Sequence, residues 1–191
     1  VIAVPSGNFG NLCAGLLAYR SGLPVKHFVA ACNINDTVSS FLQTGHYAPK
    51  PAVATISNAM DVAAPSNFVR IMEIFHQQVG DLKKMVSGYS VSDDITKKTV
   101  ASVYKNYGYI LDPHGAVAYY ALEQFLSSHA DEKGFILETA HPIKFPETVE
   151  TIIGDKIPIP AAVAPLFHKQ KKSIHIAASF DVLKELLFDR Y

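Results

Sequence analysis

A short polar turn near the start of the chain holds the residues best suited to binding chemistry. Its sequence is Ser6-Gly7-Asn8-Phe9-Gly10-Asn11. The two glycines permit close backbone approach and positive φ, and the serine and the two asparagines add side-chain donors. Because the turn contains no lysine or arginine, backbone N–H groups and neutral side chains would have to hold an anion there.

Two familiar phosphate motifs do not fit this turn. The dinucleotide pattern G-x-G-x-x-G needs other gaps than those between Gly7, Gly10 and Gly15, and the chain has no G-K-[ST] sequence of the Walker type. Dinucleotides and nucleoside triphosphates are therefore disfavoured as ligands. On spacing alone, an anion site and a plain tight turn stay open as alternatives.

The turn lies between a predicted strand and a predicted helix. The apolar run Val1–Val4 is typical of a buried parallel strand, it ends at Pro5, and residues 12–20 have helical character. The run Phe28–Cys32 predicts a second strand, so these segments fit one βαβ unit. At such a turn, N–H groups and the positive end of the helix dipole converge, which favours a bound anion.

The rest of the chain alternates further helices and strands. Capping residues and apolar spacing predict helices over 37–43, 67–78, 93–107, 113–126 and 144–153 and after Ser179, and strands over 134–138 and 173–176. This alternation predicts an α/β fold with a mostly parallel sheet flanked by helices.

Composition narrows the classes of function. The chain has 17 Lys+Arg and 17 Asp+Glu, and its densest basic cluster is Lys169, Lys171 and Lys172, so no nucleic-acid partner is expected. No apolar run approaches the roughly 20 residues that cross a bilayer, so no membrane partner is expected. Cys13 and Cys32 form no C-x-x-C pair, and no two histidines have metal-binding helical spacing beside a carboxylate. These features predict a cytoplasmic protein without a metal site.

The polar turn and several later segments resemble one enzyme family. Pro5 to Asn11 is similar to the phosphate-binding loop of the threonine synthases, which are pyridoxal-phosphate enzymes of fold type II with a tryptophan synthase β-like fold. The resemblance continues in order along nearly the whole chain, through residues 35–38, 57–62, 65–67, 113–114, 116–119 and 139–145. Gly115 stands where the family has a slightly larger residue.

The resemblance implies a cofactor, a reaction and site residues. The cofactor would be pyridoxal 5'-phosphate, and the reaction would convert O-phospho-L-homoserine and water to L-threonine and phosphate. The cofactor-binding residues would be Gly7, Asn8, Phe9, Gly10, Asn11 and Thr139. Thr139 would face the pyridine nitrogen, although a hydroxyl that caps a turn after its strand is the alternative. Substrate contacts would come from Ser6, Asp61 and Lys144.

The resemblance also implies that part of the enzyme lies outside this chain. The Schiff-base lysine of the family lies upstream in a Phe-Lys-Asp context, which does not occur here, and the chain opens on a bare strand. We therefore expect no catalytic residue in this chain and an inactive fragment, whose partner is the missing N-terminal part of the same protein. Residues 1–155 would be the C-terminal portion of the pyridoxal-phosphate-binding catalytic domain. Residues 156–191 would be a connector, a strand and a helix that pack on the same unit.

Three other readings stay open. The first is another lyase or dehydratase of fold type II, whose phosphate loops tend to be richer in glycine. The second is a non-catalytic homologue that binds a phosphate ligand, which would be favoured if the full-length protein also lacked the lysine. The third is a plain α/β interaction module, which explains the fold but not the ordered motifs.

Overall fold

The computed structural model describes residues 1–189 and places a parallel sheet at the centre of residues 1–157. Its strands lie in the order β3-β2-β1-β4, and every pairing is parallel. They are β1 (Ile2–Pro5), β2 (Phe28–Cys32), β3 (Val86–Ser90) and β4 (Phe135–Ile136). The predicted α/β fold with a mostly parallel sheet is confirmed.

The strand order reverses its direction at β1. From β1 the chain steps outward through β2 to β3, and it returns only later to place β4 on the other side of β1. The turn after β1 therefore lies at the point where strand order switches, at the carboxyl edge of the sheet. Open α/β sheets bind their ligands at this position.

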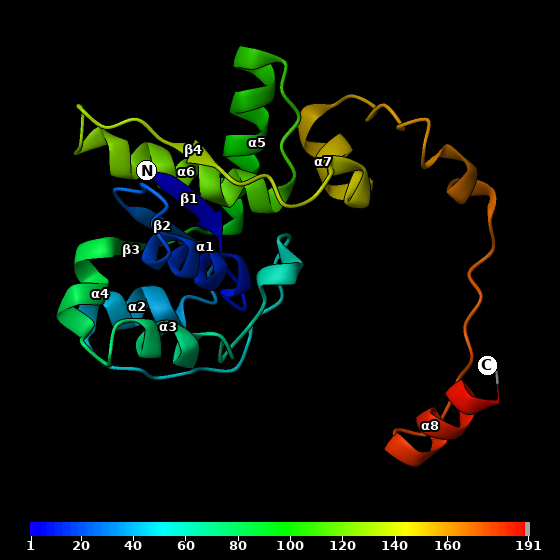
Figure 1. Cartoon of the computed structure of the whole chain (residues 1–191). Helices are drawn as coiled ribbons and strands as arrows, with labels where there is room; N and C mark the ends of the chain where they lie inside the picture. The colour runs from blue at the N-terminus through cyan, green and yellow to red at the C-terminus, as the bar shows by residue number, and fades with distance from the viewer. Residues whose placement is uncertain (190–191) are drawn as a thin grey trace. The chain divides into compact units, whose positions relative to one another are not determined.

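Helices cover both faces of the sheet (Figure 1). Within residues 1–157 they are α1 (Gly10–Arg20), α2 (Thr37–Thr44), α3 (Phe68–Ile74), α4 (Val79–Met85), α5 (Asp93–Tyr107), α6 (Pro113–Ser127) and α7 (Pro146–Ile153). Short 3-10 turns also form at η1 (Asn58–Met60) and η2 (Pro142–Lys144).

Alternate strand residues face opposite layers of helices, because side chains alternate across a strand. Val4 and Ala30 pack in one apolar cluster with residues of α1 to α4. Ala3, Val29 and Ala31 belong to a second cluster, which is formed with α6. Strands buried on both faces explain the continuous apolar runs seen in the sequence.

Several helix boundaries follow from local signals. The Asp112 carboxylate accepts from the N–H groups of His114 and Gly115, with Pro113 in the first turn of α6. Ser92 caps α5 in the same way by accepting from the N–H of Ile95. These helices begin where the caps predicted.

Three expectations about secondary structure were wrong. The single helix expected over 67–78 is interrupted, because His76 and Gln77 have φ of 51° and 61° and separate α3 from α4. Neither α4 nor β3 was anticipated. The strand expected over 134–138 is only Phe135–Ile136, so Thr139 lies beyond its end, and residues 173–176 are irregular rather than a strand.

The described residues from 158 to 189 form a second unit, which contains η3 (Ala164–His168) and α8 (Phe180–Phe188). The helix expected after Ser179 is confirmed. Several large apolar side chains of this unit are exposed, including those of Phe180, Leu187 and Phe188. That 156–191 packs on the preceding unit stays a prediction.

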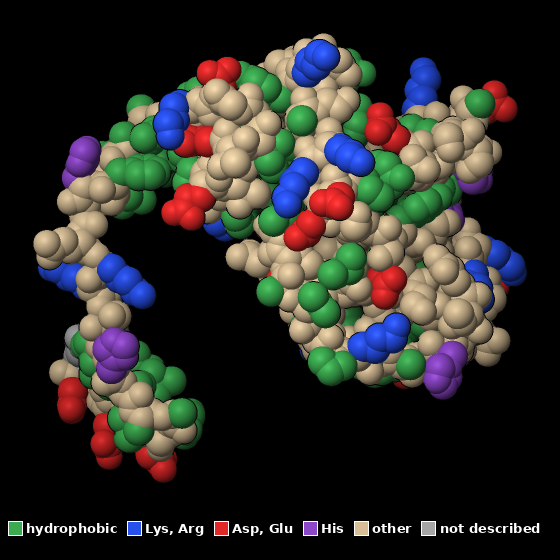
Figure 2. Space-filling view, turned by 180° about the vertical axis from the view of Figure 1, so that it is seen from behind, with side chains coloured by type: hydrophobic (Ala, Val, Ile, Leu, Met, Phe, Trp, Pro, Cys, Tyr) green, Lys and Arg blue, Asp and Glu red, His purple; other side chains and the backbone are tan. Residues whose placement is uncertain are grey.

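The surface reflects the equal numbers of basic and acidic residues in the sequence. Basic and acidic side chains are interspersed on the face shown in Figure 2. Across residues 1–189, none of the helices has the length and apolar character needed to cross a bilayer. Cys13 and Cys32 are buried free thiols, and burial raises the pKa of Cys32 to about 12.

Candidate functional site

The polar turn between β1 and α1 presents a row of unused backbone donors. Among residues 1–189, no acceptor is found for the N–H groups of residues 7–12. Phe9 is the N-cap of α1 and provides no side-chain cap, and the first turn of α1 contains no acidic residue. Free N–H groups at the positive end of a helix dipole form a ready site for an anion. This donor set fits a phosphate group.

The backbone of the turn is shaped by Phe9 rather than by its glycines. Phe9 has φ of 60°, whereas Gly7 and Gly10 are not among the residues with positive φ, so our expectation for the two glycines was wrong. The Phe9 side chain is buried in the cluster with α1 to α4. Its burial holds a backbone conformation that a bulky residue otherwise avoids.

Gly7, unlike Gly10, permits the close approach of another backbone segment. A Cβ at Gly7 would lie 2.6 Å from the Cα of Met60 and 2.9 Å from the carbonyl oxygen of Ala59. The backbone of η1 therefore packs directly against the turn. A Cβ at Gly10 would meet only the Asn67 side chain, at 3.6 Å.

Two of the three expected side-chain donors are used within the protein. The Ser6 hydroxyl donates to the carbonyl oxygen of Val4 at 2.8 Å. The Asn8 side-chain amide donates to Ser66 Oγ and its oxygen accepts from the Ser66 N–H, while Asn67 donates to the Asn8 carbonyl oxygen. Asn8 thus fastens the turn to residues 66–67, while no acceptor is found for its backbone N–H among the described residues.

The turn and Thr139 line one cavity of about 210 Å³. The lining residues are Pro5, Gly7, Asn8, Phe9, Gly10, Asn11, Ala59, Met60, His114 and Thr139. Chain segments more than a hundred residues apart are therefore brought together at the carboxyl edge of the sheet. The cavity includes all six residues that we predicted to bind the cofactor.

The three predicted substrate residues do not line this cavity. Ser6 is buried and bonded to Val4, and Lys144 is exposed at the end of η2. Asp61 accepts hydrogen bonds from the side chains of Asn33, Asn35 and Thr55 and from the Thr55 N–H. Their role in substrate binding stays a prediction.

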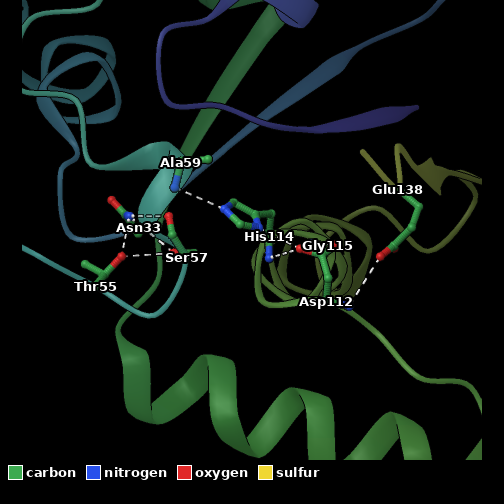
Figure 3. Close-up of polar contacts among 8 residues, drawn as sticks. All are labelled: Asn33, Thr55, Ser57, Ala59, Asp112, His114, Gly115 and Glu138. Atoms are coloured by element: carbon green, nitrogen blue, oxygen red, sulfur yellow. Dashed lines mark hydrogen bonds and ion pairs between the residues drawn. The ribbon is translucent and has the colours of Figure 1, made fainter. Parts of the chain in front are cut away.

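Asp61 and Asn33 anchor the segment that carries η1. Asn33 follows β2, and its amide also donates to Ser57 Oγ at 3.2 Å and to Thr55 Oγ1 at 2.8 Å (Figure 3). This network fixes residues 55–61 against the carboxyl edge of the sheet. It gives Asp61 a structural role within the segment 57–62, beside the substrate contact that the resemblance implies.

His114 is a cavity residue that the sequence analysis did not assign. It is 3% exposed, and it follows the N-cap residue Asp112, which is fully buried. His114 Nδ1 lies 2.6 Å from Asp112 Oδ1, and His114 Nε2 accepts from the Ala59 N–H at 3.3 Å. The sequence signal that could have found it is its place directly after the Asp112-Pro113 cap.

Glu138 lies beside this pair and titrates unusually. Its Oε1 accepts from the Asp112 N–H at 3.4 Å. Desolvation and the neighbouring Asp112 raise the pKa of Glu138 from 4.5 to about 8. Burial alone would raise the pKa of Asp112, yet hydrogen bonds from His114 and Glu138 lower it below its usual value.

We expect Glu138→Gln to remove a pH-dependent loss of stability. Because the folded-state pKa of Glu138 is raised, the folded protein binds more protons than the unfolded chain between pH 4.5 and about 8. The contribution of protonated Glu138 to the free energy of unfolding is therefore complete below pH 4.5 and is lost as the pH rises through about 8. Solvent at this exposed residue reduces the expected loss to about 1 kcal/mol.

Urea unfolding at pH 5 and pH 9 measures this effect. The wild type should lose more stability than Glu138→Gln between the two pH values. Asp112 and Tyr109, the titratable residues that interact with Glu138, are present in both proteins. Equal losses in the two proteins would contradict the raised pKa.

Comparison with known proteins gives a consistent set of matches. The family model described as pyridoxal-phosphate dependent enzyme matches residues 1–138, and the model described as threonine synthase, C-terminal, matches residues 115–187. Threonine synthase of Escherichia coli K12 is 45% identical over 189 residues, which cover 99% of this chain and 43% of that protein. The chain therefore spans less than half the length of this relative.

Solved structures agree in fold as well as in sequence. The crystal structure of threonine synthase from Escherichia coli matches with a TM-score of 0.87 and 43% identity, over 100% of this chain and 44% of that one. The pyridoxal-phosphate-bound threonine synthase from Brucella melitensis matches with a TM-score of 0.82 and 27% identity, over 98% and 45% of the two chains.

Proposed function

Because the chain belongs to the pyridoxal-phosphate dependent enzyme family, we propose that it is the C-terminal part of a cytoplasmic threonine synthase. The full-length protein would convert O-phospho-L-homoserine and water to L-threonine and phosphate, as a carbon–oxygen lyase. The similarity to threonine synthases along nearly the whole chain supports this reaction over that of other lyases and dehydratases of the same fold.

The observation that carries the proposal is the row of unused N–H groups beside Thr139 in one cavity. The N–H groups of residues 7–12 would hold the cofactor phosphate with the help of the α1 dipole. The Thr139 hydroxyl would hydrogen-bond the pyridine nitrogen. When bound, pyridoxal phosphate supplies an electron sink for negative charge on a substrate carbon.

The residues of this chain would bind and orient the cofactor without completing the chemistry. The Phe-Lys-Asp context of the family lysine does not occur in the chain, so we place that lysine in the remainder of the full-length protein. Residues 1–191 alone would then be inactive. Lys144 is exposed and would attract the phosphate of the substrate, whereas Ser6 and Asp61 are already bonded within the protein and would act mainly by position.

We expect the full-length protein to be stabilised against heat by pyridoxal phosphate and by inorganic phosphate, but not by pyridoxal. The unused N–H groups recognise the phosphate, so removing it removes most of the affinity. Thr139→Val should weaken pyridoxal phosphate binding about tenfold, because one hydrogen bond is lost. The same substitution should leave the affinity for inorganic phosphate unchanged.

Thermal melting and fluorescence titration measure these effects, and phosphate release from O-phospho-L-homoserine measures the reaction. Residues 1–191 should release no phosphate. Stabilisation by pyridoxal equal to that by pyridoxal phosphate would refute the phosphate cradle. A full-length protein that binds the cofactor but does not process this substrate would refute the threonine synthase assignment alone.

A further inference from the structure

A line of contacts connects the start of α6 with the turn that would hold the phosphate. Figure 3 shows His114 lying between Ala59 of η1 and Asp112 at the start of α6. The Phe145 ring covers the imidazole, with ring centroids 5.0 Å apart. Ala59 and Met60 in turn pack against Gly7, as the close approach at its Cα shows.

The two neighbours of His114 determine where its proton lies. The Asp112 carboxylate can only accept, so His114 Nδ1 must carry the hydrogen that joins them at 2.6 Å. The Ala59 N–H can only donate, so His114 Nε2 must offer its lone pair. Both requirements are met only by the neutral imidazole with its proton on Nδ1. The imidazole is therefore fixed in orientation and tautomer from both sides.

The hydrogen bond to Ala59 adds a polar contact to the apolar packing between η1 and α6, in which Met60 is buried in one cluster with Val117 and Ala118. Within η1, the Met60 N–H donates to Ser57 and the Asp61 N–H to Asn58. The Asn33 and Asp61 network holds η1 from the sheet side. From α6, His114 supplies a hydrogen bond to Ala59, which lies against Gly7.

We propose that His114, oriented by Asp112, is a positioning residue that sets η1 against Gly7 and so sets the spacing of the N–H groups that receive the cofactor phosphate. This inference rests on the proposed function, since it concerns the same cradle. It gives His114 a role that requires an acceptor at Nε2, and not merely a side chain of similar volume.

Two substitutions of His114 in the full-length protein distinguish a hydrogen-bonding role from a packing role. Glutamine can place an amide oxygen near the position of Nε2, whereas asparagine reaches only the position of Nδ1. His114→Asn should therefore raise the Kd for pyridoxal phosphate and for inorganic phosphate about tenfold. His114→Gln should recover most of the affinity. His129→Asn, two residues after the end of α6 and not among the residues that line the cavity, is the matched control.

Asp112→Ser tests the tautomer. Serine also caps helices well, so α6 is retained, but its shorter side chain leaves Nδ1 without the acceptor that Asp112 Oδ1 provides and allows the proton to move to Nε2. The Ala59 contact would then be lost, and both Kd values should rise about as in His114→Asn. The ¹⁵N shifts of the His114 imidazole report the tautomer directly, independently of activity.

The outcomes distinguish this inference from the proposed function. If the wild type binds neither pyridoxal phosphate nor inorganic phosphate, the proposed function fails. If the wild type binds both and His114→Asn binds them as tightly, the positioning role is wrong. Equal weakening by His114→Asn and His114→Gln would also overturn it, because a packing role would not distinguish the two.

Discussion

Replacing Gly7 with alanine should destabilise the protein and nearly abolish cofactor binding. The added Cβ would lie 2.6 Å from the Cα of Met60 and 2.9 Å from the carbonyl oxygen of Ala59. Both are backbone atoms of η1. Hydrogen bonds of Asn33, Asp61 and His114 hold this segment, so it cannot move without weakening them. We expect a loss of about 2 kcal/mol in the free energy of unfolding, within the range for overpacked sites.

The same displacement should raise the Kd for pyridoxal phosphate about a hundredfold, because the N–H groups of the turn are moved apart together. Urea unfolding and fluorescence titration of the full-length protein measure the two effects. Gly10→Ala is the control for stability, since its Cβ would meet Asn67 only at an ordinary distance of 3.6 Å. Similar unfolding free energies for the two variants would show that the approach of η1 to Gly7 is unimportant.

Asp61→Ala should cause a comparable loss of stability, for a different reason. The carboxylate accepts four hydrogen bonds, two from Thr55 and one each from Asn33 and Asn35. Removing it leaves several donors without their acceptor, and we expect the free energy of unfolding to fall by about 3 kcal/mol. Asp61→Asn keeps one acceptor oxygen and should lose about 1 kcal/mol.

Denaturant unfolding together with substrate kinetics of the full-length protein measures these effects. It also separates this anchoring role from the substrate contact that the sequence suggested. An anchoring role predicts reduced stability and weaker cofactor binding. An Asp61→Ala protein with wild-type stability and a raised KM for the substrate would support a direct contact instead.

The sequence predicts well those features that depend on neighbours along the chain. The βαβ unit and the caps at Ser92 and Asp112 are confirmed, because apolar runs, capping residues and glycines act within a few residues. The position of the polar turn follows from the same signals. The resemblance to threonine synthases also pointed to Thr139, which lines the cavity together with the turn.

The sequence predicts poorly what depends on distant partners. The positive φ lies at Phe9 because its side chain is buried among residues of several helices. The strand β3 contains Ser87, Gly88 and Ser90, so its apolar signal is weak, and its pairing with β2 defines it. The alternating residues 173–176 form no strand, since no pairing with another strand is found among residues 1–189.

The fastening of the polar turn to distant segments has a consequence for synthesis and folding. Asn8 is hydrogen-bonded to Ser66 and Asn67, which lie 58 and 59 positions later in the chain. The cavity is also lined by His114 and Thr139. Such long-range contacts require closure of large loops, which is slow. The cradle therefore cannot form on a nascent chain until nearly all of the first unit has left the ribosome. A ligand of this cradle would therefore bind only after the first unit has almost completely folded, and it would stabilise the folded unit rather than an early intermediate.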